Sequence, residues 1–153
     1  MRWCSMYEFN GLLVPVDFSA AARAAFERAL ELASGEYAMV ILLHVMDTSL
    51  IEFATANELA AREEVVDAMR ARAELALADY KAPAAAPVEV MTIIVEGVPF
   101  LEIIKKAEEL GVDAIVMGKF GTSGKLEPYL FGTTAERVVR GSTRPVIVLP
   151  TRS

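Results

Sequence analysis

The chain has 153 residues, a formal net charge of −6 and 54% hydrophobic residues. This length predicts one domain with a proper core, and an acidic balance without a basic run argues against nucleic acid as the main partner. No apolar run approaches the ~20 residues that span a bilayer, so we expect no membrane segment. The single cysteine, Cys4, excludes an intramolecular disulfide and is compatible with a reducing compartment, so we expect a cytoplasmic protein.

Short apolar runs alternate with helical periodicity along the chain. Apolar runs between turn residues predict strands buried on both faces, and apolar residues spaced by three and four predict amphipathic helices. In chain order we expect a strand at 12–16, a helix at 19–34, a strand at 39–46, a helix at 56–80, a strand at 88–95, a helix at 99–111, a strand at 114–117, a helix at 133–141 and a last strand within 144–150. Ser19 is the expected N-cap of the first helix, and Gly111 is the expected end of the third.

The alternation of five strands with four helices predicts an α/β fold. Right-handed crossovers place the helices on both faces of a parallel sheet, which gives a three-layer sandwich. We expect a single domain over residues 9–151 and a flexible N-terminal arm over residues 1–8.

The segment 112–134 contains a short buried strand, a glycine-bearing loop and the start of a helix. Glycines let the backbone approach an anion closely, and a helix start offers free N–H groups and the positive end of the helix dipole. These parts in this order predict a phosphate-binding geometry. The loop is not a Walker A motif, because Gly124-Lys125 is followed by Leu126, and no G-x-G-x-x-G fingerprint lies at a strand-to-helix turn.

Several polar residues have both a structural and a functional interpretation. Asp17 follows the first strand at the edge where open α/β sheets bind ligands, but it could also simply organise the turn or cap the helix. Thr133 and Glu136 have the spacing of a capping box, which is compatible with a phosphate at the same helix start. His44, the only histidine, lies in an apolar run and is expected to be a packed, hydrogen-bonded core residue.

Five short motifs are spread over the chain between residues 11 and 150. They are LVPVDFS at 13–19, LHV at 43–45, EGVP at 96–99, GVDAIVMG at 111–118 and RPVIV at 144–148. In this order and at this spacing they resemble the universal stress protein family, as a UspA-like domain. The resemblance implies a five-stranded sheet with strand order 3-2-1-4-5. It also implies a homodimer paired through the last strand, at Val146, Ile147 and Val148.

Members of that family that bind ATP resemble G-x2-G-x9-G-[S/T] after the fourth strand. Gly118, Gly121 and Gly132-Thr133 match this pattern, except that ten residues rather than nine separate Gly121 from Gly132. By resemblance, the adenine would lie against an apolar surround, Asp17 would contact the ribose or the adenine edge, and the glycine-rich backbone would meet the ribose and phosphates. The binding residues implied in this way are Pro15, Val16, Asp17, Val45, Met117, Gly118, Gly121, Gly132, Thr133 and Thr134.

The resemblance therefore implies an ATP-binding domain acting in stress response or signalling, with any Mg²⁺ held mainly by phosphates and water. No nucleophile–base pair or metal-ligand cluster is visible in the sequence, so we expect no catalysis beyond slow ATP hydrolysis. One alternative, favoured by the longer loop, is a stress protein that binds no nucleotide and acts as a dimeric protein-interaction module. Another is an enzyme of the related adenine-nucleotide α-hydrolase-like folds, against which the short length and the lack of an SGGxDS-type loop argue.

Overall fold

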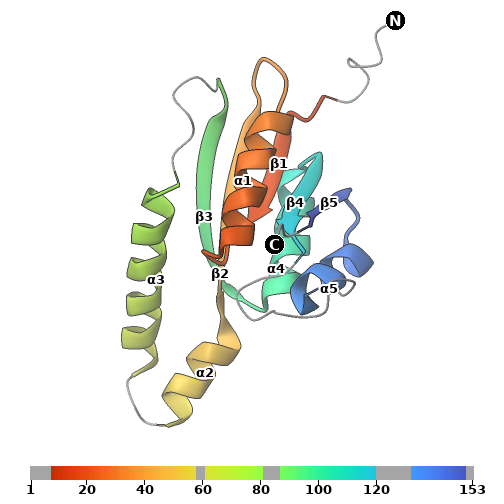
Figure 1. Cartoon of the computed structure of the whole chain (residues 1–153). Helices are drawn as coiled ribbons and strands as arrows, with labels where there is room; N and C mark the ends of the chain where they lie inside the picture. The colour runs from red at the N-terminus through yellow and green to blue at the C-terminus, as the bar shows by residue number, and fades with distance from the viewer. Residues whose placement is uncertain (1–7, 58–60, 81–86, 120–131, 151–153) are drawn as a thin grey trace, which may run out of the picture.

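The computed structural model describes residues 8–57, 61–80, 87–119 and 132–150 (Figure 1). The elements follow one another as β1 (Gly11–Pro15), α1 (Ala20–Leu32), β2 (Met39–Asp47), α2 (Thr48–Ala56), α3 (Arg62–Ala78), β3 (Glu89–Gly97), α4 (Pro99–Leu110), β4 (Ala114–Gly118), α5 (Thr133–Gly141) and β5 (Val146–Leu149). The arm predicted over residues 1–8 lies outside the described residues, apart from Glu8.

The strands form one parallel five-stranded sheet with the order β3-β2-β1-β4-β5. The predicted fold class and strand order are therefore confirmed. Central strand β1 pairs on both sides, so that Leu13 is in register with Ile41 of β2 and with Ile115 of β4. Because the chain proceeds to one side of β1 through β2 and to the other through β4, the carboxyl ends of β1 and β4 form the switch point where open α/β sheets bind ligands.

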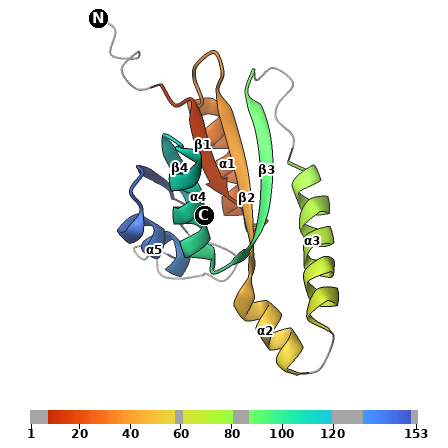
Figure 2. The same cartoon turned by 180° about the vertical axis from the view of Figure 1, so that it is seen from behind.

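Successive side chains along the strands point to opposite faces of the sheet and build two separate cores. Leu12 of β1 packs with α1 and with Leu77 of α3. Leu13, the next residue, packs on the other face with Ile103 of α4 and Val138 of α5. Figures 1 and 2 show the resulting layers, and the predicted three-layer sandwich with helices on both faces is confirmed.

The helix predicted over residues 56–80 is confirmed only in part, because α3 covers residues 62–78 of it. The sequence analysis did not predict α2, which precedes that range and which Figure 1 shows lying beyond the carboxyl end of β2. Asp47 caps α2, because its Oδ1 accepts hydrogen bonds from the Ser49 N–H at 2.9 Å and from the Ser49 hydroxyl at 2.7 Å. The other predicted element bounds agree with the structure to within two residues.

Two predicted helix ends are confirmed and a third is wrong. The Ser19 hydroxyl accepts a hydrogen bond from the Ala22 N–H at 3.1 Å as the N-cap of α1. Gly111 ends α4 with a left-handed φ of 63°, which glycine adopts without steric cost. The capping box does not form, because α5 already begins at Thr133, with Gly132 as its N-cap and no side-chain cap. Glu136 forms an ion pair with Arg140 at 3.0 Å instead.

Within the described ranges, no helix combines the length and the apolar character that a bilayer crossing requires.

Candidate functional site

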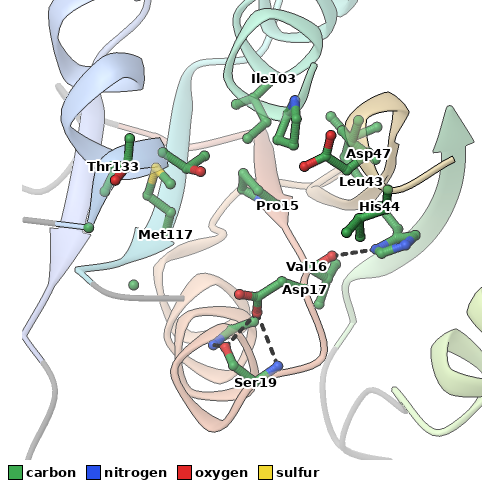
Figure 3. Close-up of a pocket in the computed structure, with 18 of the residues that line it drawn as sticks. Pro15, Val16, Asp17, Ser19, Leu43, His44, Asp47, Ile103, Met117 and Thr133 are labelled. Carbon is green, nitrogen blue, oxygen red and sulfur yellow. Dashed lines mark hydrogen bonds between the residues drawn. The ribbon is translucent and has the colours of Figure 1, made fainter. Parts of the chain in front are cut away.

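A pocket of about 540 Å³ lies at the carboxyl ends of β1, β2 and β4 (Figure 3). Its volume falls in the range of roughly 300–1,000 Å³ that small-molecule sites occupy. Helices α1 to α5 contribute the remaining walls. The lining residues are Pro15, Val16, Asp17, Ser19, Ala22, Leu43, His44, Val45, Asp47, Leu50, Met69, Pro99, Ile103, Met117, Gly118, Gly132, Thr133, Thr134 and Ala135.

The pocket brings together residues from four separate segments of the chain, and these residues were predicted from the sequence to form one site. The predicted residues that line it are Pro15, Val16, Asp17, Val45, Met117, Gly118, Gly132, Thr133 and Thr134. Gly121 lies outside the described residues. The structure thus places the predicted residues around one cavity, and their roles toward a ligand stay a prediction.

Asp17 organises the turn between β1 and α1. Its Oδ1 accepts hydrogen bonds from the Ser19 N–H at 3.0 Å and from the Ser19 hydroxyl at 2.5 Å. Phe18, between them, has a positive φ of 65°, a conformation that is costly for a bulky residue and is held only by its surroundings. The structural interpretation of Asp17 is therefore correct. The same residue also lines the pocket.

A cluster of aromatic rings packs against this turn. The Phe18 ring lies 4.6 Å from the His44 ring and 6.4 Å from the Tyr80 ring, measured between centroids. Burial raises the pKa of the Tyr80 phenol; the Arg23 charge opposes the rise and the Asp17 charge adds to it. The guanidinium of Arg23 stacks on the Tyr80 ring at 4.0 Å. These contacts fix the backbone that presents Asp17 to the pocket.

The start of α5 is suited to an anion. The first helical hydrogen bond of α5 joins the Glu136 N–H to the Gly132 carbonyl at 3.0 Å. The N–H groups of Thr133, Thr134 and Ala135 precede that bond and so have no acceptor within the helix. By contrast, side chains cap the starts of α1 and α2. The described residues provide no side-chain cap for α5, as for α3 and α4, so the start of α5 presents N–H groups of the kind that bind phosphate and other anions.

Gly118 is required where β4 passes close to α1. A Cβ built at Gly118 would lie 2.8 Å from the Ala21 Cβ and 3.3 Å from the Ala21 backbone. The glycine thus has a packing reason of its own, in addition to the close ligand approach that the loop motif predicts.

Among the lining residues that the sequence missed are Asp47, at the end of β2, and four residues from α2, α3 and α4. These four are Leu50, Met69, Pro99 and Ile103. A signal existed for Asp47, which ends β2 much as Asp17 follows β1. Assigning Leu50 to the pocket would have required predicting α2, and assigning Met69 would have required knowing how α3 packs.

His44 is packed against Phe18 and hydrogen-bonded, as predicted, but it is not a buried core residue. Its Nδ1 lies 2.7 Å from the Val16 carbonyl oxygen. Because a carbonyl oxygen only accepts, this bond places the proton on Nδ1. The side chain is only half-buried, and it also lines the pocket.

The charged groups of the pocket are unevenly distributed. Asp17 and Asp47 supply carboxylates, and no Lys or Arg occurs among the described residues that line it. Among the described residues, positive potential is available from the backbone at the starts of α4 and α5, neither of which has a side-chain cap. In the part of the chain that the structure describes, no cluster of three or more His, Cys, Asp or Glu side chains is placed to hold a metal ion.

Known proteins share this sequence pattern and fold. Universal stress protein MJ0577 of Methanocaldococcus jannaschii is 31% identical over 162 aligned residues, which cover 92% of this chain and 94% of the relative. The solved structure of MJ0577 has a TM-score of 0.74 and 32% identity, and the match covers 96% of this chain and 99% of that one.

Two more distant structures share the fold and were solved with adenine nucleotides. A universal stress protein in complex with cAMP has a TM-score of 0.60 and 21% identity, over 95% of this chain and all of that chain (100%). The universal stress protein from Archaeoglobus fulgidus in complex with dAMP has a TM-score of 0.58 and 20% identity, over 93% and 97%.

The sequence model of the universal stress protein family matches residues 8–150 of this chain. The sheet order, the pocket at the switch point and the identity to MJ0577 agree with this match. The chain belongs to the universal stress protein family.

Proposed function

We propose that the pocket binds an adenine nucleotide, with ATP as the ligand, and that the protein acts through this nucleotide in stress response or signalling. The proposal rests on the difference in charge between two parts of the pocket. A carboxylate follows the central strand β1, and an open helix start faces the same cavity from α5. A nucleoside triphosphate has matching ends, because ribose hydroxyls donate hydrogen bonds and phosphates accept them.

In this proposal the base lies against apolar walls and the phosphates lie at α5. Pro15, Val45 and Met117 supply apolar surface around the base. The N–H groups of Thr133 and Thr134 meet the phosphates, and Mg²⁺ enters with ATP, held by phosphates and water. Relatives with this fold that were solved with cAMP and dAMP support adenine nucleotides as the class to test first.

We assign the nucleotide a signalling or structural role with at most slow hydrolysis. Phosphoryl transfer is accelerated by cationic side chains that neutralise the transition state. The described residues that line the pocket include no such side chain. A cytoplasmic location, expected from the single cysteine, is part of the same proposal.

The direct test is to denature the purified full chain and identify the small molecules released by mass spectrometry. We expect an adenine nucleotide in amounts that scale with the protein. An extract without nucleotide, from a protein that also fails to take up added Mg·ATP, would favour the dimeric interaction module without nucleotide. The ten-residue spacing between Gly121 and Gly132 is the feature that favours this second candidate.

Asp17→Asn is expected to weaken Mg·ATP binding by about tenfold, because a hydrogen bond to a charged group contributes roughly 1.5–3 kcal/mol. Asparagine keeps an oxygen for Ser19, so the free energy of unfolding should stay within about 0.5 kcal/mol of the wild type. Asp17→Ala removes that acceptor as well and should lower the free energy of unfolding by about 1 kcal/mol. Calorimetric titration and urea denaturation measure the two effects separately.

Asp113→Asn is the matched control for this carboxylate. Asp113 lies at the amino ends of the strands, opposite the pocket, where its Oδ2 accepts hydrogen bonds from the N–H groups of Asn10 at 2.8 Å and Gly11 at 2.9 Å. The Asp113→Asn substitution should leave Mg·ATP affinity unchanged. Equal affinities of wild type and Asp17→Asn would remove Asp17 from the ligand site.

We also propose that the chain forms a homodimer through β5, with Val146, Ile147 and Val148 at the interface. β5 is an edge strand of the sheet. The Pro145 carbonyl accepts a hydrogen bond from the Ile115 N–H of β4, and the Leu149 carbonyl accepts one from the Lys119 N–H just after β4. By strand alternation, the backbone groups of Val146 and Val148 therefore face outward. Such an edge of β-branched residues is suited to pairing with a second strand.

Val148→Pro tests the dimer, because it removes an outward N–H and leaves the β4 bonds in place. We expect sedimentation velocity to show a dimer for the wild type and a shift toward monomer for Val148→Pro. Val148→Thr keeps the N–H and should remain dimeric. A wild type that sediments as a monomer at all concentrations contradicts the proposal.

A further inference from the structure

Asp47 is a second carboxylate of the pocket, on a different strand from Asp17. It ends β2, lines the pocket and is half-buried. Figure 3 shows its side chain pointing into the cavity, on the side away from Asp17. A half-buried carboxylate has lost part of its hydration and is stabilised by hydrogen-bond donors.

The position of this carboxylate is fixed, and one of its oxygens stays available. Both hydrogen bonds that the described part of the chain shows for the Asp47 side chain end on Oδ1, from the Ser49 N–H and the Ser49 hydroxyl. No ion pair joins Asp47 to a Lys or Arg among the described residues. The Oδ2 atom can therefore accept a donor that a ligand supplies.

The walls contributed by α2, α3 and α4 are apolar. Leu50, Met69, Pro99 and Ile103 line the same pocket as Asp47. Apolar walls with one fixed acceptor suit a flat heteroaromatic ring that carries a donor on its edge. Phosphate is disfavoured at this end of the pocket, because it would meet the Asp47 charge.

We propose that Asp47 determines base specificity by accepting a hydrogen bond from an exocyclic amino group, so that the pocket selects a 6-amino purine over a 6-oxo purine. This rests on the nucleotide function proposed above. A 6-oxo base presents a carbonyl oxygen where the 6-amino base presents N–H, so two acceptors would face each other. Sites built to hydrogen-bond a ligand group reject analogues that lack it, because the buried partner is left unpaired.

The test compares ATP with ITP, whose base carries oxygen in place of the amino group. Titration calorimetry of the nucleotide-free full chain should give at least about tenfold tighter binding of Mg·ATP than of Mg·ITP, the ratio that corresponds to one hydrogen bond to a charged group. In Asp47→Asn this preference should fall to about threefold or less, or reverse. The asparagine oxygen can still accept from Ser49 while its NH₂ group offers a donor to the 6-oxo base. Asp67→Asn, on the exposed surface of α3, is the control and should keep the wild-type ratio.

The outcomes separate this inference from the function on which it rests. Equal affinity of the wild type for ATP and ITP overturns the inference without any variant and leaves nucleotide binding in place. A wild-type preference for ATP that Asp47→Asn retains also overturns it, and assigns the amino group to another acceptor. Failure of the wild type to bind either nucleotide removes the proposed function and the inference together.

Discussion

Thr134→Asp is expected to weaken Mg·ATP binding by about 100-fold, which corresponds to about 2.7 kcal/mol. Thr134 lies in the first turn of α5 and lines the pocket. A carboxylate there would compete for the free N–H groups and repel a phosphate, and two like charges about 4 Å apart interact by roughly 4 kcal/mol near a protein surface before salt screening. Binding of adenosine, which has no phosphate, should change by no more than about threefold.

The same substitution should not destabilise the protein, which separates loss of binding from loss of fold. A negative charge in the first turn of a helix is favourable by about 0.3–1 kcal/mol, so the free energy of unfolding should stay equal or rise. Thr134→Asn has nearly the same shape without the charge, and it should cost Mg·ATP binding less than about fivefold. Similar losses for the Asp and Asn variants would show that the phosphates do not lie at α5.

Phe26→Ala is expected to lower the free energy of unfolding by about 3–5 kcal/mol, the usual range for removing a buried aromatic side chain. Phe26 of α1 is only 1% exposed. It packs against Leu12 and Val14 of β1 in the core between α1 and the sheet, and its ring lies 5.4 Å from the Tyr80 ring. The substitution therefore leaves a cavity beneath the helix that follows the Asp17 turn. Urea denaturation measures the change.

Phe26→Leu separates the volume of the side chain from its aromatic character. Leucine fills most of the space and should cost no more than about 1.5 kcal/mol. Leu75→Ala, on α3, is a surface control because Leu75 is 73% exposed, and it should change the free energy of unfolding by less than about 0.5 kcal/mol. A loss below about 1 kcal/mol for Phe26→Ala would contradict the packing of α1 on β1.

The sheet was predictable because its strands carry a clear local signal. β1, β2 and β4 are short apolar runs between turn residues, and their burial on both faces explains why polar alternation is absent. The strand order was available only through the family resemblance, since alternation of strands and helices is compatible with more than one order.

The errors concern helix starts, where a shift of one residue changes the interpretation. Thr133 was a plausible N-cap by residue type, but Gly132 occupies that position. The Asp47-Thr48-Ser49 start signal was overlooked, so residues 48–56 were not assigned to a helix. In both cases the sequence contains the helix-start signal, but more than one residue within one or two positions could serve as the N-cap.

The candidate site was predictable where it follows the strands and the glycine motif. Asp17, Met117 and Gly118 come directly at or after strand ends, and the carboxyl edge of a parallel sheet gathers such residues. Leu50 and Met69 reach the pocket from α2 and α3, and no local pattern indicates where those helices pack. The wall that they form with Asp47 became visible only in the structure.

Calorimetric titration of the nucleotide-free full chain with Mg·ATP tests the central claim most directly. The account predicts saturable binding, with one nucleotide per chain and a dissociation constant on the order of micromolar. The titration should be repeated at several temperatures, because the heat capacity change of binding moves the enthalpy through zero at one of them. Absence of binding heat at every temperature would contradict the account and leave the pocket without its proposed ligand.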